Sequence, residues 1–299
     1  MERFLQYLFD GLSQGSIYAF LALGLVIIYR GSGHLNFAQG EMAMMSAFVA
    51  WWLADNGVGL WAAVGLSAVF AFVVAMGVER FIIRPIGHRS PFAVVVAAIG
   101  LFLGLNALAP FIWKVTIPEA FGSLFPNDAD DFIRIGGAEW RIENLGVLGV
   151  LAVTSLLLFL LFQRTRFGLA MRAVATNPES APLVGIRAGQ VLAVSWGLAA
   201  AVGAVGGALV GSLRGNVDAS MMFTIFFAAT AAATLGGYDS LFGAVFGGLV
   251  LGVFENMVAG YQEDLIGQEL KGVVSLLVIL GVLLVKPSGL FGSQRVERV

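Results

Sequence analysis

The chain has 299 residues, of which 59% are apolar and only 12% are charged, and its formal net charge is −2. A soluble domain carries about 45–50% apolar and about 25% charged residues. These charges are too few to cover a soluble protein of this length, so the composition predicts a surface that mostly faces a lipid bilayer. The lack of cysteine excludes disulfides, thiolate metal sites and cysteine nucleophiles, and the charge balance gives no indication of nucleic acid.

Nine apolar runs follow one another along the chain and predict membrane segments. A spanning helix needs about 20 residues, so residues 1–299 have room for roughly eight to ten segments and form a single transmembrane domain. The runs lie at about 12–29, 36–54, 60–79, 92–113, 145–162, 191–213, 223–237, 241–260 and 270–286. No small-residue cleavage site follows the first run, which we expect to be retained rather than removed as a signal peptide.

Two of these runs differ from an ordinary spanning helix. The run 223–237 is short and ends in two glycines, so we expect a half-length or re-entrant segment, which protein or a water-filled cavity must cover. The run 36–54 opens with polar Asn36, Gln39 and Glu41, and we expect it to enter the bilayer obliquely. The predicted fold class is therefore an all-α polytopic bundle of about eight to ten membrane segments, one or two of them re-entrant.

The distribution of Lys and Arg predicts the orientation, because cytoplasmic loops of membrane proteins are enriched in these residues. The loop 163–190 carries four arginines, and basic residues also follow the third and the last runs. The loop 114–144 holds six carboxylates against three basic residues, and the connection 261–269 has three acidic residues and no basic ones. We therefore expect nine crossings, with the N-terminus outside, the loop 114–144 external, and the loop 163–190 and the C-terminus in the cytoplasm.

Small residues recur at a spacing of four in two of the later runs. They are Ala199, Gly203, Gly207 and Gly211 in one run, and the pairs Gly243/Gly247 and Gly248/Gly252 in the other. This spacing lets helix backbones approach closely. We expect packing between helices of one subunit, with a subunit interface as the alternative. No internal repeat is evident in the pattern, although inverted repeats can escape inspection.

The loop 163–190 has more local order than a connector between two spans needs. Its apolar residues at helical spacing are Phe167, Ala170, Met171 and Val174. Asn177, followed by Pro178 and Glu179, is a helix-start signal, and Gly185 stands where this second short helix should end. We interpret the loop as a docking element for a cytoplasmic partner, with a surface loop stabilised by its own caps as the alternative.

The motif Glu179-Ser180-Ala181, followed by three residues and then Gly185, resembles the EAA-loop pattern of ABC importer permeases, with Ser180 in place of the first alanine. The whole stretch Arg166–Ile186 resembles the corresponding loop of the branched-chain amino acid permease family, of the LivH type. Further stretches similar to that family follow in the same order, at 15–25, 35–41, 235–237, 243–249 and 286–292.

This resemblance implies a permease subunit of an ATP-driven importer for branched-chain or other apolar amino acids, in the inner membrane of a bacterium or archaeon. Its partners would be ATP-binding cassette subunits, a second permease of the LivM type or another copy of itself, and a periplasmic or extracellular solute-binding protein. The coupling residues that this implies in the loop are Arg166, Arg172, Asn177, Glu179 and Gly185. None of the three lysines ends a G-x-x-x-x-G-K-[ST] phosphate loop, so we expect partner subunits to hydrolyse ATP and this chain to hold no cofactor.

Polar residues inside the apolar runs are candidates for the substrate path, because ionisable groups in a membrane are costly without a use. Asn36, Gln39 and Glu41 are the candidates for lining or gating it, and a hydrogen-bonded pin between helices is the alternative. Family members commonly show His where Gln39 stands. We interpret Asn106 as such a pin, and Glu255 as solvated near the outer end of its span.

Other functions fit parts of this pattern. His34 and His88 are isolated, so we expect no metal site and no Ser/His/Asp catalytic set, and an intramembrane enzyme has no catalytic candidates. Urea or short amides are alternative substrates, since close relatives of the family carry them. A self-sufficient secondary transporter or channel, with Glu41 as its ion or proton site, is the alternative from another class. The loop 163–190 favours the importer, because a secondary transporter needs no docking loop.

Overall fold

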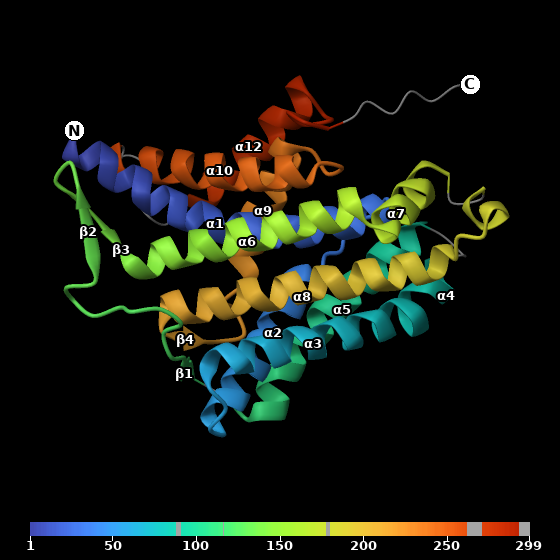
Figure 1. Cartoon of the computed structure of the whole chain (residues 1–299), viewed down its shortest axis with the longest axis horizontal. Helices are drawn as coiled ribbons and strands as arrows, with labels where there is room; N and C mark the ends of the chain where they lie inside the picture. The colour runs from blue at the N-terminus through green and yellow to red at the C-terminus, as the bar shows by residue number, and fades with distance from the viewer. Residues whose placement is uncertain (88–90, 116, 178–179, 262–270, 293–299) are drawn as a thin grey trace.

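The computed structural model describes residues 1–299 except 88–90, 116, 178–179, 262–270 and 293–299. Its long helices lie side by side along the longest axis of the molecule (Figure 1). The α-helices are α1 (Glu2–Ser32), α2 (Gln39–Asp55), α3 (Leu60–Val78), α4 (Arg84–Gly87), α5 (Pro91–Trp113), α6 (Ile142–Arg164), α7 (Arg166–Thr176), α8 (Ala188–Arg214), α9 (Phe223–Gly236), α10 (Leu241–Tyr261) and α12 (Lys271–Val285). A π-helical turn, Glu79–Ile83, joins α3 to α4. The prediction of an all-α polytopic bundle is confirmed.

Short strands mark one end of the bundle. Strand β1 (Glu119–Ala120) pairs antiparallel with β4 (Asn216–Val217), and β2 (Phe132–Ile135) forms a hairpin with β3 (Ala138–Arg141). Helix α7 lies at the opposite end (Figure 1). We call these two ends of the molecule the strand end and the α7 end.

Six helices in the described part of the chain are long and apolar enough to cross a membrane. They are Glu2–Ser32, Leu60–Gly87, Phe92–Trp113, Ile142–Arg164, Ala188–Arg214 and Leu241–Tyr261. Helix α9 has 14 residues, which is about 21 Å at 1.5 Å per residue against the roughly 30 Å of a bilayer core. The prediction of a half-length segment at 223–237 is confirmed, and it follows from the glycines that end the helix.

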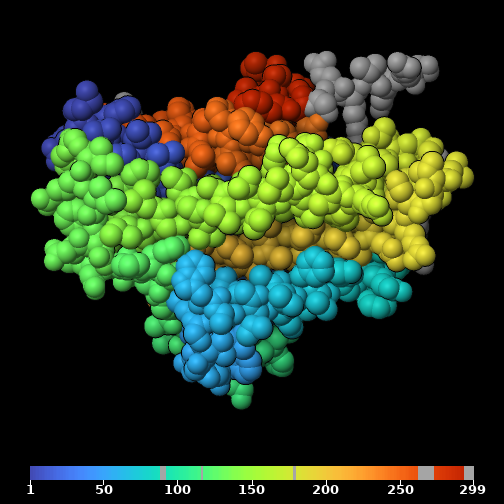
Figure 2. Space-filling view, in the orientation of Figure 1, coloured from blue at the N-terminus to red at the C-terminus, as the bar shows by residue number. Residues whose placement is uncertain are grey.

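Helix α1 forms the centre of the bundle. In its most apolar stretch 89% of the residues are buried, against 22% in α6 and 17% in α5. Large apolar side chains such as Val69, Leu103 and Leu157 are instead more than half exposed on the outer helices. Figure 2 shows α6 crossing the visible face from the strand end towards the α7 end. Apolar side chains exposed on the outer helices are what a protein surrounded by lipid requires.

Glycines bring the buried helices into backbone contact. A Cβ on Gly252 of α10 would lie 2.3 Å from the Gly15 nitrogen of α1, and one on Gly207 of α8 would lie 2.4 Å from the Ala43 oxygen of α2. Such distances are far shorter than van der Waals contact, so only glycine fits. The prediction that these small residues pack helices within one subunit is confirmed.

Helices α1–α2–α3 and α8–α9–α10 repeat one arrangement in opposite directions. Helices α1 and α8 run antiparallel, with Phe20 beside Gly206 and Gly31 beside Ser195. Each packs against the third helix of the other set, α1 against α10 and α8 against α3. Opposed sets of this kind occur in many transporters, and this one was not evident from the sequence.

Helices α2 and α9 begin next to each other inside the bundle. Gly33 ends α1 with φ 71° and Gly215 ends α8 with φ 67°, and a polar connection follows each of them. The start of α2 then meets the start of α9, since a Cβ on Gly40 would lie 3.5 Å from the Met222 oxygen. The run 36–54 therefore begins its helix within the bundle and not at its surface.

A turn after α12 completes the end of α9. The Leu290 nitrogen donates to the Leu235 carbonyl at 2.8 Å, and the Phe291 nitrogen donates to the Gly236 carbonyl at 3.0 Å. The Phe291 ring packs edge-on against Phe242 of α10. These bonds satisfy two of the carbonyl groups that a helix leaves free at its C-terminus.

Candidate functional sites

The polar start of α2 is buried and hydrogen-bonded. Asn36, Gln39 and Glu41 are each at most 1% exposed. The Gln39 side-chain nitrogen donates to the Ala199 carbonyl of α8 at 3.0 Å. Gly24 of α1 leaves room for this amide, since a Cβ there would lie 2.3 Å from the Gln39 nitrogen. Gln39 thus lies where α1, α2 and α8 meet, and Asn36 Nδ2 donates to Gln39 Oε1 at 3.4 Å. Glu41 faces α5 instead.

Glu41 is the carboxylate of this group, and Asn106 on α5 is its partner. Asn106 Nδ2 donates to Glu41 Oε2 at 3.1 Å and to the Ala219 carbonyl at 2.8 Å. Because Ala219 precedes α9, one amide links α5 both to α2 and to the lead-in of α9. The interpretation of Asn106 as a pin between helices is confirmed.

These residues are internal in the conformation described. None of Asn36, Gln39 and Glu41 lines either of the two cavities described below. Their hydrogen bonds are those of a pin between helices, and a substrate path along them would require the helix starts to separate. Their assignment to the path stays a prediction.

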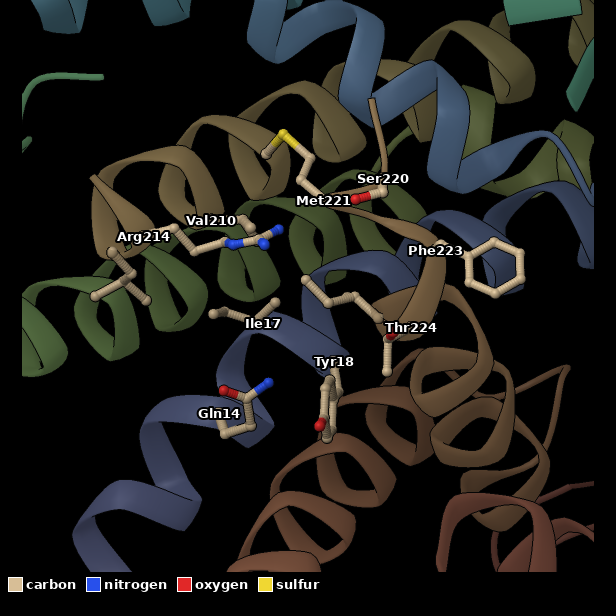
Figure 3. A pocket seen from close by; sticks show the side chains of 11 residues that line it. Gln14, Ile17, Tyr18, Val210, Arg214, Ser220, Met221, Phe223 and Thr224 are labelled. Atoms are coloured by element: carbon tan, nitrogen blue, oxygen red, sulfur yellow. The ribbon is translucent and has the colours of Figure 1, made fainter. Parts of the chain in front are cut away.

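A cavity of about 530 Å³ lies between α1, α8 and the start of α9 (Figure 3). Arg214 in its wall ends α8 two residues before β4, so the cavity belongs to the strand-end half of the bundle. Gln14 and Tyr18 of α1, Arg214 of α8 and Thr224 of α9 contribute polar groups to its wall. Sequence reasoning missed this cavity because its walls come from segments about 200 residues apart. The one sequence feature that could have indicated a polar cavity is Gln14, a polar residue in the first apolar run, four residues before Tyr18.

A smaller cavity of about 310 Å³ lies at the end of α2, beside β1. Asp55, Val58 and Gly122 are among its lining residues, which include no cation.

A second buried carboxylate, Glu255, joins α10 to α1 and α12. It is 2% exposed. The Tyr18 hydroxyl donates to Glu255 Oε2 at 2.7 Å, and the Ser275 hydroxyl donates to Glu255 Oε1. The interpretation of Glu255 as a solvated interfacial residue was therefore wrong, because the neighbouring helices supply donors to it inside the bundle.

Helix α7 at the α7 end is attached to the bundle by an apolar face. Met171 and Val174 are 1% and 2% exposed, and Phe167 packs on the core. The Thr165 hydroxyl caps the helix by accepting a hydrogen bond from the Gly168 nitrogen at 3.3 Å. The helical spacing of apolar residues predicted this face correctly.

The other face of this loop is exposed. Arg166 and Arg172 are both exposed, and Arg172 donates to the Gln163 side chain at 3.1 Å. Beyond α7, the 3₁₀-helix Ala181–Val184 presents Leu183 and Val184, which are 86% and 74% exposed.

The predicted helix start at Asn177 takes the form of a turn. Asn177 ends α7, and its side-chain oxygen accepts a hydrogen bond from the Ser180 nitrogen at 2.9 Å. Gly185 ends the 3₁₀-helix with φ 82°, where a helix end was expected. Glu179 lies outside the described residues. The coupling role of this loop stays a prediction.

Comparison with known proteins extends over nearly the whole chain. The chain is 31% identical to the high-affinity branched-chain amino acid transport system permease protein LivH of Escherichia coli K12. That alignment covers 99% of this chain and 98% of that protein. It is 31% identical to the permease protein BraD of the corresponding system of Pseudomonas aeruginosa, with the same coverage. It is 26% identical to the LivH-type permease of Methanocaldococcus jannaschii over 91% of this chain and 87% of that protein.

Two solved structures share the fold at low sequence identity. PsaBC from Streptococcus pneumoniae in complex with a Fab aligns with a TM-score of 0.51 and 15% identity, over 95% of this chain and 92% of that chain. A metal-chelate type ABC transporter in an inward-facing conformation aligns with a TM-score of 0.51 and 15% identity, over 94% and 87%. The architecture is therefore that of an ABC transporter permease.

The family model described as branched-chain amino acid transport system, permease component, matches residues 7–283. That range includes the buried centre around Glu41, the cavity beside Arg214 and the whole of the loop 163–190. This protein is a multi-pass, non-catalytic membrane subunit and belongs to the branched-chain amino acid transport permease family.

Proposed function

We propose that this chain carries branched-chain or other apolar amino acids inward as the permease of an ATP-driven importer. The observation that carries the proposal is the match to LivH and BraD, which spans 99% of the chain.

A permease of an ABC system works with ATPase and binding-protein partners, and the α7 end is the surface we assign to the ATPase. Arg166 and Arg172 would face acidic groups of that partner. Leu183 and Val184 are adjacent, exposed, large apolar side chains at this end, and a contiguous exposed apolar surface is typical of an interaction site. The buried attachment of Met171 and Val174 would let α7 transmit movement to α6 and α8.

The charge of the two ends supports the predicted orientation. The α7 end carries Arg164, Arg166, Arg172 and Arg187, and the loop 114–144 at the strand end carries six carboxylates. Because basic loops stay in the cytoplasm, we place the α7 end inside the cell and the strand end outside. The second permease subunit would be a LivM-type homologue or another copy of this chain.

Uptake by the complete transporter tests the proposal. The permease, its ATPases and its permease partner are reconstituted in proteoliposomes with ATP on the ATPase side and the binding protein on the other side. We expect uptake of leucine, isoleucine or valine that stops without ATP. Uptake of urea or acetamide in place of these amino acids would contradict the substrate. Uptake driven by an imposed proton gradient without ATP would contradict the importer.

A further inference from the structure

Arg214, the last residue of α8, provides a cation at the cavity between α1, α8 and α9. Its side chain is 44% exposed, and its guanidinium points from α8 towards the middle of the cavity (Figure 3). Within the described part of the chain this guanidinium makes one ion pair, with Asp218 Oδ2 at 3.5 Å. That distance is too long for a strong hydrogen bond, so several of the five guanidinium donors remain for another acceptor.

The carboxylate of Asp218 is already engaged by the turn before α9. Its Oδ1 accepts hydrogen bonds from the Ser220 nitrogen at 2.8 Å and from the Ser220 hydroxyl at 2.6 Å. Asp218 therefore holds the wall of the cavity in place and does not line it. A further carboxylate, that of Glu255, lies behind Tyr18 and accepts a hydrogen bond from the Tyr18 hydroxyl.

The rest of the wall suits a small molecule with an apolar group. Ile17, Val210 and Met221 present buried aliphatic surface, and Gln14 and Thr224 add neutral polar groups. The volume of about 530 Å³ falls in the range of about 300–1,000 Å³ that small-molecule sites occupy. One cation, an aliphatic surface and neutral polar groups match a carboxylate joined to an apolar side chain.

The first turn of α9 adds to this preference for an anion. Thr224 and Ile225 line the cavity. Their backbone nitrogens find no acceptor among the described residues, whereas the Phe223 nitrogen donates to the Ser220 carbonyl. Free N–H groups at a helix start favour negative charge.

We propose that this cavity is a binding site for the cargo on the strand-end side of the permease, and that Arg214 binds the carboxylate of a zwitterionic apolar amino acid there. The proposal rests on the proposed function for the identity of the cargo. It adds the site, the group recognised and the residue that recognises it. A neutral amide or an amine without a carboxylate would not be held.

Charge-selective labelling tests the site, and the chain has no native cysteine to interfere. Thr224→Cys is introduced in the complete transporter, without binding protein, in nanodiscs of neutral lipid. The rates at which this chain is labelled by an anionic (sulfonate) and a cationic (trimethylammonium) methanethiosulfonate reagent are then measured. The matched control is Val58→Cys in the smaller cavity, beside Asp55.

We expect the ratio of anionic to cationic rate to be about tenfold or more higher for Thr224→Cys than for Val58→Cys, because a fixed cation concentrates anions near it. Adding Arg214→Gln should lower the ratio of anionic to cationic rate at Thr224→Cys several-fold, and Arg214→Lys should retain it. Millimolar L-leucine should slow the labelling, and L-leucinamide, which lacks the carboxylate, should not.

Three results would overturn the proposal. They are an equal rate ratio in the two cavities, a ratio that Arg214→Gln does not change, and protection by inorganic sulfate or anionic lipid that L-leucine does not match. Uptake by the unmodified transporter is measured separately. If that uptake is normal while labelling fails, the site is wrong and the proposed function stands. If uptake of branched-chain amino acids is absent, the proposed function fails whatever the labelling shows.

Discussion

The hydroxyl of Tyr18 on α1 donates a hydrogen bond at 2.7 Å to Glu255 on α10, 237 residues later in the chain. Glu255 is 2% exposed and Tyr18 is 6% exposed, so this carboxylate takes its hydrogen bonds mainly from neighbouring side chains. The contact lies along the glycine-mediated packing of α1 on α10 and ties the first long helix to the second half of the bundle.

Tyr18→Phe removes this donor from a buried carboxylate. We expect a loss of about 1–3 kcal/mol in the free energy of unfolding, the usual cost of an unmet buried polar group. Thermal unfolding of the purified protein in detergent measures it. Tyr7→Phe is the control, because it keeps the ring contact with Tyr261 at 5.4 Å. Equal melting temperatures for both variants would show that the bond contributes nothing.

Gly252→Ala would place a methyl group against the backbone of α1, 2.3 Å from the Gly15 nitrogen. We expect the two helices to separate and stability to fall by about 1–3 kcal/mol, as overpacking does. Gly149→Ala on α6 is the control, since a Cβ there has no neighbour within 4 Å in the described part of the chain. Both changes raise helix propensity alike, so the difference in melting temperature and abundance isolates the contact.

Glu41→Gln keeps an oxygen that can accept from Asn106 but removes the negative charge. We expect normal assembly and an altered stimulation of ATP hydrolysis by the loaded binding protein, because a carboxylate at this depth is costly without a use. ATPase assays in proteoliposomes measure this stimulation. Asn106→Leu, which removes the amide but not the charge, tests whether the pin itself is responsible. Normal hydrolysis and uptake with Glu41→Gln would exclude Glu41 from the substrate path.

Gly185 provides a test of the loop that involves no packing change. Its φ is 82° and a Cβ there meets no atom of the described residues within 4 Å, so a substitution is expected to act through backbone strain. Gly185→Val should therefore weaken ATPase association or its response to the binding protein, at near-normal abundance of the permease. Gly185→Asn is the control, because Asn tolerates this conformation far better. Co-purification of the ATPase and its stimulated rate measure the effect, and normal values for Gly185→Val would make the loop a passive connector.

Cysteines introduced at Asp130 and Arg172 test the orientation. Asp130 is exposed in the acidic loop at the strand end and Arg172 is exposed on α7. In whole cells a membrane-impermeant maleimide should label Asp130→Cys and not Arg172→Cys, and both should be labelled after lysis. Labelling of Arg172→Cys alone in intact cells would invert the predicted topology.

The features that sequence predicted correctly are those that depend on neighbouring residues. The apolar face of α7 follows from the spacing of Met171 and Val174, and the short α9 follows from the glycines after it. The close approach of Gly252 to α1 follows from its spacing of four from Gly248, although its partner helix was unknown.

The features that sequence missed depend on which helices meet. Glu255 stands near the end of an apolar run, and the run does not reveal that Tyr18 and Ser275 face it from other helices. The opposed arrangement of α1–α2–α3 and α8–α9–α10 leaves no residue pattern, because reversing the direction of a helix does not require similar side chains. The cavity at Arg214 exists only where three such helices leave a space between them.

The turn after α12 has a consequence for the order in which the protein is made. The carbonyls of Leu235 and Gly236 accept hydrogen bonds from the nitrogens of Leu290 and Phe291, which follow more than 50 residues later. A ribosome extends the chain at about 5–20 residues per second, so these bonds form only after that stretch has been made. Helix α9, at the heart of the second half, is thus among the last parts to be finished. A ribosome that stops before Leu290 would release a chain with every long span made and this end of α9 still open.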